Sequence, residues 1–147
     1  MDTMGVIEKQ WRQVRSGAQK VNQIQNSYDE LLIGLSKAAQ EMESELAVSV
    51  SGSRQAAALQ SVFGEAEIKL AWAPGDDGIE GVILFLAKSN LNNDKLVIFE
   101  ARIHPWDGHY FFLGNGVAKH NDWNSLPNYY YTILQNALFK QVEFSAK

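Results

Sequence analysis

The sequence predicts an α+β protein: a long N-terminal heptad-patterned helix, or a helical hairpin, followed by a four-stranded antiparallel meander with a C-terminal helix packed on it. In the first third, apolar residues recur alternately every four and three positions, which is the spacing of a coiled-coil seam. From residue 47 onward the apolar period changes to two, which is typical of half-buried strands. We therefore expect a coiled-coil-like helical arm over residues 1–46 and an α+β body over residues 47–147.

The seam of the first third contains a single polar side chain, that of Gln25. Its members are Ile7, Trp11, Val14, Ala18, Val21, Gln25, Tyr28, Leu32, Leu35, Ala39, Met42 and Leu46. A continuous helix over residues 4–46 would be about 65 Å long at 1.5 Å per residue, whereas a body of a hundred residues has a radius of gyration of about 13 Å. About half of the helix would therefore project from the body, and its apolar seam would need a partner. Trp11 fits poorly in a regular two-stranded coil, which makes it a candidate anchor for that partner.

Charge divides the same segment into two halves. Residues 1–25 carry four basic and two acidic side chains, a balance of +2, whereas residues 26–46 carry one basic and five acidic side chains, a balance of -4. This division favours antiparallel pairing of residues 4–21 with residues 28–46, either between two long helices or within a helical hairpin. A turn at residues 22–27 fits the capping box of Ser27 and Glu30, whereas the unbroken heptad register fits a continuous helix. The sequence leaves both arrangements open.

The apolar stripe broadens in the second half of the arm, where Leu31, Leu32, Ile33 and Leu35 follow closely on one another. A wide stripe is typical of a helix packed on a globular core, so we expect this half to dock on the body. A β-prone stretch follows at residues 47–51. We then expect a short helix from Ser53, as N-cap, to Phe63, and a half-buried strand over residues 66–72.

Two nearly continuous apolar runs, residues 79–88 and 95–104, predict the central strands, and residues 109–113 predict the last one. Because the two central runs are apolar on both faces, we expect one helix to cover each face of the sheet. Ser125, with Pro127 two residues later, opens the C-terminal helix.

Composition limits the classes of function. The chain has no cysteine, a net charge of -4 and no uninterrupted apolar run near the roughly 20 residues that a membrane span needs. We therefore expect a soluble cytoplasmic protein that binds neither nucleic acid nor membranes.

All three histidines fall within residues 104–120. In a simple hairpin His104 and His109 would lie opposite each other, close enough to share a metal with Asp107, His120 or Asp122. The alternative is that these are polar turn residues, and the sequence has no dedicated ligand motif such as His-Glu-x-x-His. We expect no metal, no cofactor and no catalytic residues. Each histidine-to-alanine change should then cost less than about 1.5 kcal/mol of stability.

Aromatic and amide side chains concentrate in residues 104–131. They include Trp106, Tyr110, Trp123 and the run from Tyr129 to Tyr131. Such a composition suits a binding hot spot or a polar ligand site, and it also suits packing of the core and its rim.

These observations favour a non-enzymatic protein–protein interaction module, such as an adaptor, inhibitor, immunity or chaperone-like protein, that assembles through its N-terminal helix, with a homodimer as the expected state. The residues expected to contact the partner are Ile7, Trp11, Val14, Ala18, Val21, Trp106, Trp123 and Tyr129. The alternative is a small-ligand-binding or sensor domain that uses the cluster at residues 104–131. A metal-dependent hydrolase would instead use the histidines.

Overall fold

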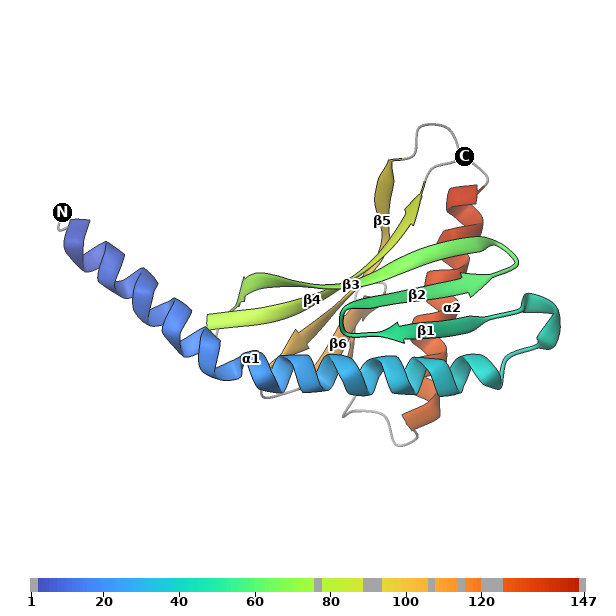
Figure 1. Ribbon diagram of the computed structural model, residues 1–147, viewed down its shortest axis with the longest axis horizontal. Helices are drawn as coiled ribbons and strands as arrows, with labels where there is room; N and C mark the ends of the chain where they lie inside the picture. Colours follow the sequence, from blue (N-terminus) through green and yellow to red (C-terminus); the bar gives the residue numbers. More distant parts are fainter. Residues whose placement is uncertain are drawn as a thin grey trace.

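Seven antiparallel strands form one sheet, and their order in the sheet is their order in the chain, β1-β2-β3-β4-β5-β6-β7. The computed structural model describes residues 3–75, 78–88, 94–105, 108–113, 116–119 and 126–145. The elements are α1 (Thr3–Gln40), a 3-10 turn η1 (Ser44–Leu46), β1 (Ser49–Ser53), β2 (Ala56–Ser61), β3 (Gly64–Gly75), β4 (Gly78–Lys88), β5 (Lys95–His104), β6 (Gly108–Leu113), β7 (Gly116–Lys119) and α2 (Leu126–Ser145). The protein is thus α+β with an antiparallel sheet and a C-terminal helix (Figure 1).

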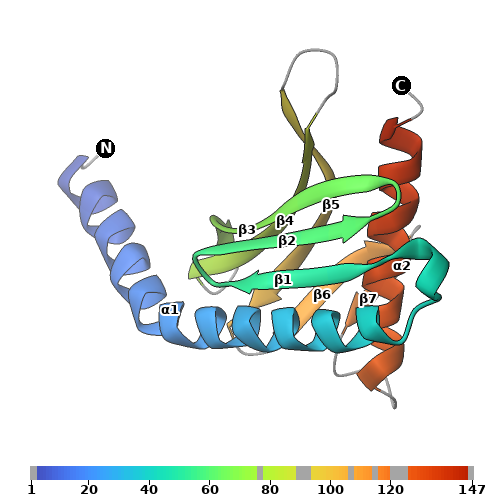
Figure 2. The same cartoon turned by 45° about the vertical axis from the view of Figure 1, so that its right-hand side comes forward.

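Helix α1 has two parts that differ in direction and in burial. It bends so that its first part points away from the sheet, while its second part runs along the sheet (Figures 1 and 2). Among the described side chains of α1, the first that is buried is that of Lys20. We call residues 3–19 the arm and residues 20–40 the docked part. The structure therefore corrects the predicted helix: it ends at Gln40 instead of residue 46, and its two parts do not share one straight seam. Residues 22–27 are helical, so no hairpin turn forms there.

The docked part of α1 packs its broad apolar face on the inner face of the sheet, as its sequence predicts. The buried apolar residues of this part are Ile24, Tyr28, Leu31, Leu32, Leu35, Ala38 and Ala39. Hydrogen bonds also join it to the sheet: the Tyr28 hydroxyl donates to the Ile68 carbonyl of β3 at 3.3 Å, and Nε2 of His109 on β6 lies 2.8 Å from the Ser27 carbonyl. Because a carbonyl oxygen only accepts, Nε2 of His109 carries the hydrogen. Residues 20–40 thus belong to the body, and the projecting arm is shorter than the predicted residues 1–46.

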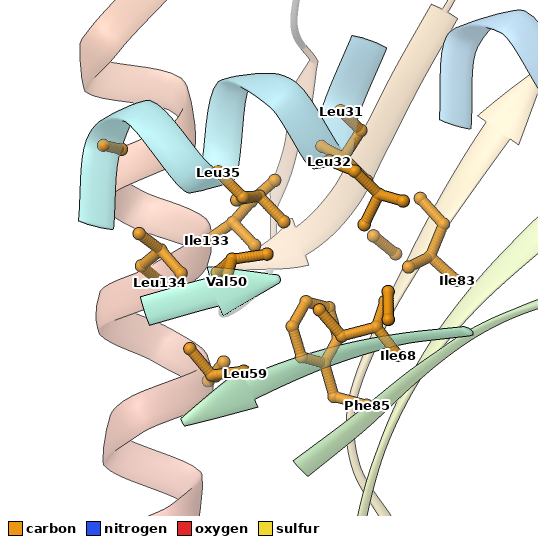
Figure 3. Packing of buried hydrophobic residues seen from close by; sticks show 14 of the residues in the cluster. Leu31, Leu32, Leu35, Val50, Leu59, Ile68, Ile83, Phe85, Ile133 and Leu134 are labelled. Atoms are coloured by element: carbon orange, nitrogen blue, oxygen red, sulfur yellow. The ribbon is translucent and has the colours of Figure 1, made fainter. Parts of the chain in front are cut away.

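Helix α2 packs beside α1 on the same inner face, so both helices share one core with the sheet. Ile133 and Leu134 of α2 lie near Leu35 of α1 and Val50 of β1 (Figure 3). A chain of aromatic rings continues the core from Phe99 through Phe111 to Tyr129, with centroids 5.7 and 5.5 Å apart. The expectation that one helix covers each face of the sheet is therefore wrong.

Charged side chains screen the outer face instead. Arg102 lies within ion-pair distance of Glu80 and Glu100, at 3.6 and 3.1 Å, and the Tyr110 hydroxyl donates to Glu80 at 3.1 Å. Val82, on this face, is nevertheless buried. Long charged side chains cover apolar surface with their aliphatic stems, which explains how this face does without a helix.

The segment from Ser53 to Phe63 forms a hairpin instead of the predicted helix. The turn at Arg54 and Gln55 joins β1 to β2, and Gly52, with φ +102°, lies where a Cβ would overlap the backbone of Ala56. Burial in β2 alternates, with Ala57 and Leu59 buried and Gln60 exposed. Alanine favours helices intrinsically, but packing of a period-two face outweighs that weak preference.

The remaining strands confirm four predicted segments in β3 to β6, of which β5 has the predicted bounds and the other three are longer. The predicted number of strands is wrong, because β1, β2 and β7 extend the meander to seven. Residues 126–145 form the C-terminal helix, as the Ser-x-Pro start predicts. Among the described residues, no helix is long and apolar enough to cross a membrane.

Replacing Tyr28 by phenylalanine tests the docking of α1. At neutral pH the variant should lose about 1 kcal/mol, the usual net value of one hydrogen bond. Burial, and secondarily Asp29, raises the pKa of Tyr28 to about 12, whereas an unfolded tyrosine titrates near ~10. The unfolded wild type therefore loses this proton first, and the wild type loses stability as the pH rises from about 10 towards 12. Urea unfolding across this pH range should show that the difference in free energy of unfolding between the wild type and the variant narrows and then changes sign. A difference that stays constant with pH contradicts the assignment.

Candidate protein-binding surface on helix α1

The arm exposes three large apolar side chains. Trp11 is 58% exposed, Val6 45% and Ile7 44%. Ile7 and Trp11 are four residues apart and so lie on one face of the helix, one turn above the other. The arm also projects away from the sheet (Figure 2), so this apolar face is open to another molecule.

The contacts within the arm contribute little to its stability. Arg12 forms an ion pair with Glu8 at 3.6 Å, and both side chains are well exposed. Such a pair on a helix surface is worth about 0.3–0.5 kcal/mol. The Arg15 guanidinium lies 5.9 Å from the centre of the Trp11 ring, a cation–π contact of about 0.5–1 kcal/mol at an exposed site. Because a helix of this length without tertiary packing is marginal in water, a partner that covers the apolar face would also stabilise the arm.

Trp72 is a further exposed aromatic residue near the start of the docked part, and the sequence assigned it to a half-buried strand. It is 42% exposed and pairs with Gly81 across β3 and β4. A Cβ at Gly81 would contact Ile24 of α1, so Trp72 lies close to the point where the arm leaves the body. Its alternation with Ile68 and Leu70 predicted a buried face, but its own side chain is partly exposed.

The predicted partner-binding residues do not all gather on the arm. Ile7 and Trp11 are exposed on it, and Val21 is half-buried at the start of the docked part. Tyr129 has no exposed surface and belongs to the core, so it cannot contact a partner in this conformation. Four other predicted residues give no test. Val14 and Ala18 lie in α1, but their side chains are outside the described part of the structure, and Trp106 and Trp123 fall outside the described residues altogether.

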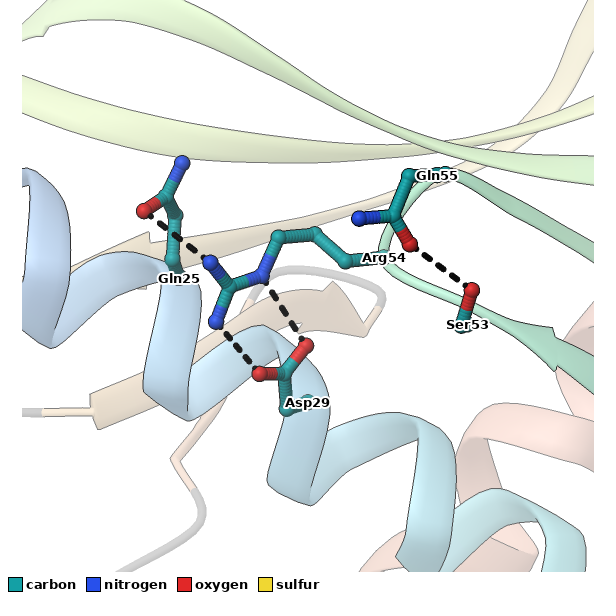
Figure 4. Close-up of polar contacts among 5 residues, drawn as sticks. All are labelled: Gln25, Asp29, Ser53, Arg54 and Gln55. Carbon is teal, nitrogen blue, oxygen red and sulfur yellow. Dashed lines mark hydrogen bonds and ion pairs between the residues drawn. The ribbon is translucent and has the colours of Figure 1, made fainter.

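Two acidic residues of the segment 26–46 bind groups of their own chain. Arg54, in the turn between β1 and β2, donates through Nη2 to Asp29 Oδ2 at 2.5 Å, through Nε to Asp29 Oδ1 at 3.3 Å and through Nη1 to Gln25 at 3.3 Å (Figure 4). Farther along, Glu41 accepts a hydrogen bond from the Tyr131 hydroxyl at 2.8 Å, and this bond raises the pKa of Tyr131.

These contacts explain two features of the sequence. The polar seam position Gln25 lies where the β1–β2 turn meets the helix, and Asp29 and Glu41 bind Arg54 and Tyr131 of their own chain. The predicted antiparallel pairing of residues 4–21 with residues 28–46 is therefore wrong, because the apolar face of the latter segment is buried against its own sheet.

The described aromatic residues of the cluster at residues 104–131 are dispersed over the fold. Tyr110 lies on the outer face with Glu80, and Tyr129 is in the core, where burial raises its pKa. Tyr130 packs its ring against α1 where a Cβ at Gly34 would overlap it, and burial, followed by Glu30, raises its pKa. Tyr131 turns to Glu41. These four side chains therefore do not line one ligand site.

The two described histidines face opposite sides of the sheet. His104 pairs with Gly108, whereas His109 pairs with Ile103. The prediction that His104 and His109 lie opposite each other is therefore wrong, because the strands pair one residue out of the predicted register. A slip of one residue turns a side chain to the other face. Within the described part of the chain, no three histidine, aspartate or glutamate side chains come together in a way that could hold a metal ion. His120, Asp107 and Asp122 lie outside the described residues.

A second exposed apolar area surrounds a cleft of about 780 Å³ at the C-terminal end of α2. Its lining includes Phe63, Leu96, Val97 and Phe144, and also Glu65, Lys88, Lys140 and Glu143. The two acidic and two basic side chains balance, so the cleft favours neither sign of ligand charge. It shares no residue with the predicted cluster at residues 104–131.

Comparison of the chain with protein-family models, with curated proteins and with solved structures gives no match.

The two histidines should differ in their effect on stability. His109 is 2% exposed, donates to the Ser27 carbonyl and stacks on Tyr129, so His109→Ala should cost about 2–4 kcal/mol through a cavity and a lost buried hydrogen bond. This value replaces the smaller cost expected from sequence. His104→Ala, on the outer face, should cost less than about 1 kcal/mol. Urea unfolding of both variants at neutral pH measures the difference, and equal costs would contradict it.

Proposed function

We propose that the protein is a non-enzymatic interaction module, of the adaptor, inhibitor, immunity or chaperone-like kind, that binds a protein partner through the apolar face of its arm. The observation that carries the proposal is the exposure of Val6, Ile7 and Trp11 on a helix that projects from the body. The body contributes a rigid base, since the docked part of the same helix is built into its core.

Three physical arguments support this use of the arm. Tryptophan is enriched among residues that dominate binding energy at interfaces, and Trp11 lies in the middle of the arm. Burial of its exposed apolar surface is worth about 25 cal/mol per Å². In addition, an arm that gains helical stability when covered couples binding to ordering, which suits a regulated interaction.

The alternatives have weaker support. The described tyrosines of residues 104–131 do not converge, so the ligand-binding alternative lacks an assembled site among them. The separated His104 and His109 likewise give no support to metal-dependent hydrolysis. We place the protein in the cytoplasm as part of the same proposal, because a chain without cysteine fits a reducing compartment.

A matched pair of alanine variants tests the proposal. Trp11 and Phe139 are exposed to a similar degree on two helices, 58% and 61%. Each change to alanine should move stability by no more than about 0.5 kcal/mol, as is usual at exposed positions. Trp11→Ala should weaken capture of the partner from an extract of the source cell at least about tenfold, whereas Phe139→Ala should leave it unchanged.

Quantitative mass spectrometry of the captured proteins measures both effects. Equal capture by the wild type and Trp11→Ala would contradict binding through the arm.

A further inference from the structure

We propose that the arm binds the arm of a second copy of this chain, in antiparallel orientation, with Glu8 of each copy beside Arg15 of the other. This inference rests on the proposed function and names the partner.

Glu8 and Arg15 occupy the same heptad position. With Ile7 and Trp11 on the seam at d and a, both charged residues fall at e, seven residues apart. In an antiparallel pair, position e of one helix faces position e of the other. Two-fold symmetry then creates two Glu8–Arg15 contacts from one complementary pair of residues.

Parallel pairing offers no such match. There, position e faces position g of the other helix, five residues earlier in the chain. Glu8 and Arg15 would then face Thr3 and Gln10, which carry no charge. Charged flanks of a seam set the orientation of a pair, and here they favour the antiparallel one.

The arm has the length that this pairing needs. In the antiparallel pair, seam residue 11 lies opposite seam residue 14 of the second copy. Any two residues that lie opposite each other then have residue numbers that add up to 25. Residue 5, near the tip, then lies level with Lys20 of the second copy, which is where the body begins. The overlap of about 15 residues is about 22 Å long. The two bodies therefore stand at opposite ends of the pair.

The tip of the arm also reaches the other exposed apolar residue of this region. Val6 and Ile7 come level with residues 19 and 18 of the second copy, close to the start of its docked part. Trp72 lies beside that part, because its cross-strand partner Gly81 is in close contact with Ile24 of α1. The Trp72 side chain is 42% exposed. Pairing of the arms thus brings Val6 and Ile7 towards Trp72 and covers apolar groups of both copies.

Charge reversal tests the pairing in the full chain. We expect sedimentation equilibrium of the wild type, up to on the order of 100 μM, to show a monomer–dimer equilibrium, because a helix pair of this length is a small interface. Glu8→Arg and Arg15→Glu should each weaken the dimer about tenfold or more, since each turns two attractions into two repulsions. The double variant should recover the wild-type dissociation constant within about threefold, and an equal mixture of the two single variants should form heterodimers.

A control separates this effect from the ion pair within the arm. Arg12→Gln removes the Glu8–Arg12 pair at a heptad position away from the seam, and it should leave the dissociation constant unchanged. Circular dichroism of every variant checks that the arm and body keep their helical content. Equal dissociation constants for the wild type and both single reversals would overturn antiparallel pairing.

Cross-linking reads the orientation directly. Since the chain has no cysteine, only introduced thiols react with a short bis-maleimide. A mixture of Glu8→Cys and Arg15→Cys chains should give the 8–15 product in preference to the 8–8 and 15–15 products. Preference for the 8–8 and 15–15 products would overturn the antiparallel arrangement.

The outcomes also separate this inference from the proposed function. A wild type that stays monomeric throughout the concentration range overturns self-pairing, while capture of a different protein that depends on Trp11 still supports the interaction module. A dimer that is insensitive to Trp11→Asp overturns self-pairing through the arm, and capture that is also insensitive to Trp11 overturns the proposed function.

Discussion

The burial of Tyr28 and its neighbours under the inner face of the sheet is the contact on which the rest of the structure depends. The ring of Tyr28 is fully buried, and its hydroxyl donates to the Ile68 carbonyl. In the opposite direction, His109 of β6 donates to the Ser27 carbonyl of the helix. Each large apolar side chain of this face contributes about 1.5–3 kcal/mol through burial. The docked part is therefore fixed, and the part of α1 that precedes it has no sheet beneath it and must project.

The same contact determines what the charges of the helix do. Once the apolar face of residues 28–39 is buried, Asp29 lies beside the β1–β2 turn, where Arg54 binds it with two hydrogen bonds, and Glu41 lies beside Tyr131 of α2. The acidic half is thus used to attach a turn and a second helix to α1. In the arm, Arg12 pairs with Glu8 and the Arg15 guanidinium lies over the Trp11 ring, so these charges make their contacts within the arm itself. The division of charge along the segment therefore does not reflect pairing of its two halves with each other.

The long apolar stripe and the long apolar runs could be read from the sequence. The face of an element on which a given side chain lies, and the effect of tertiary packing on a short segment, could not. The wide apolar stripe at Leu31–Leu35 indicated docking, and the runs at residues 79–88 and 95–104 indicated central strands, because each pattern has one compact solution. The alanine-rich segment after Ser53 was misassigned, since intrinsic propensity is weak compared with the burial of Leu59. Tyr129 could not be distinguished from Tyr130 and Tyr131 without the rotation of α2. On the arm, Ile7 and Trp11 were predicted correctly as exposed, because a helix longer than its domain leaves part of its seam uncovered.

A heptad seam does not by itself say whether a sheet or another helix covers it, because both require the same apolar stripe. In this chain the sheet covers the second part of the seam, where changes affect folding. In the first part, Ile7 and Trp11 are exposed. Trp11 can therefore vary without disturbing the core, and Tyr28 cannot. Because the arm is marginally stable alone, any molecule that covers Ile7 and Trp11 also extends the rigid helix outward from the docked part. The position of a partner is then set by the same helix that Tyr28 holds against the sheet.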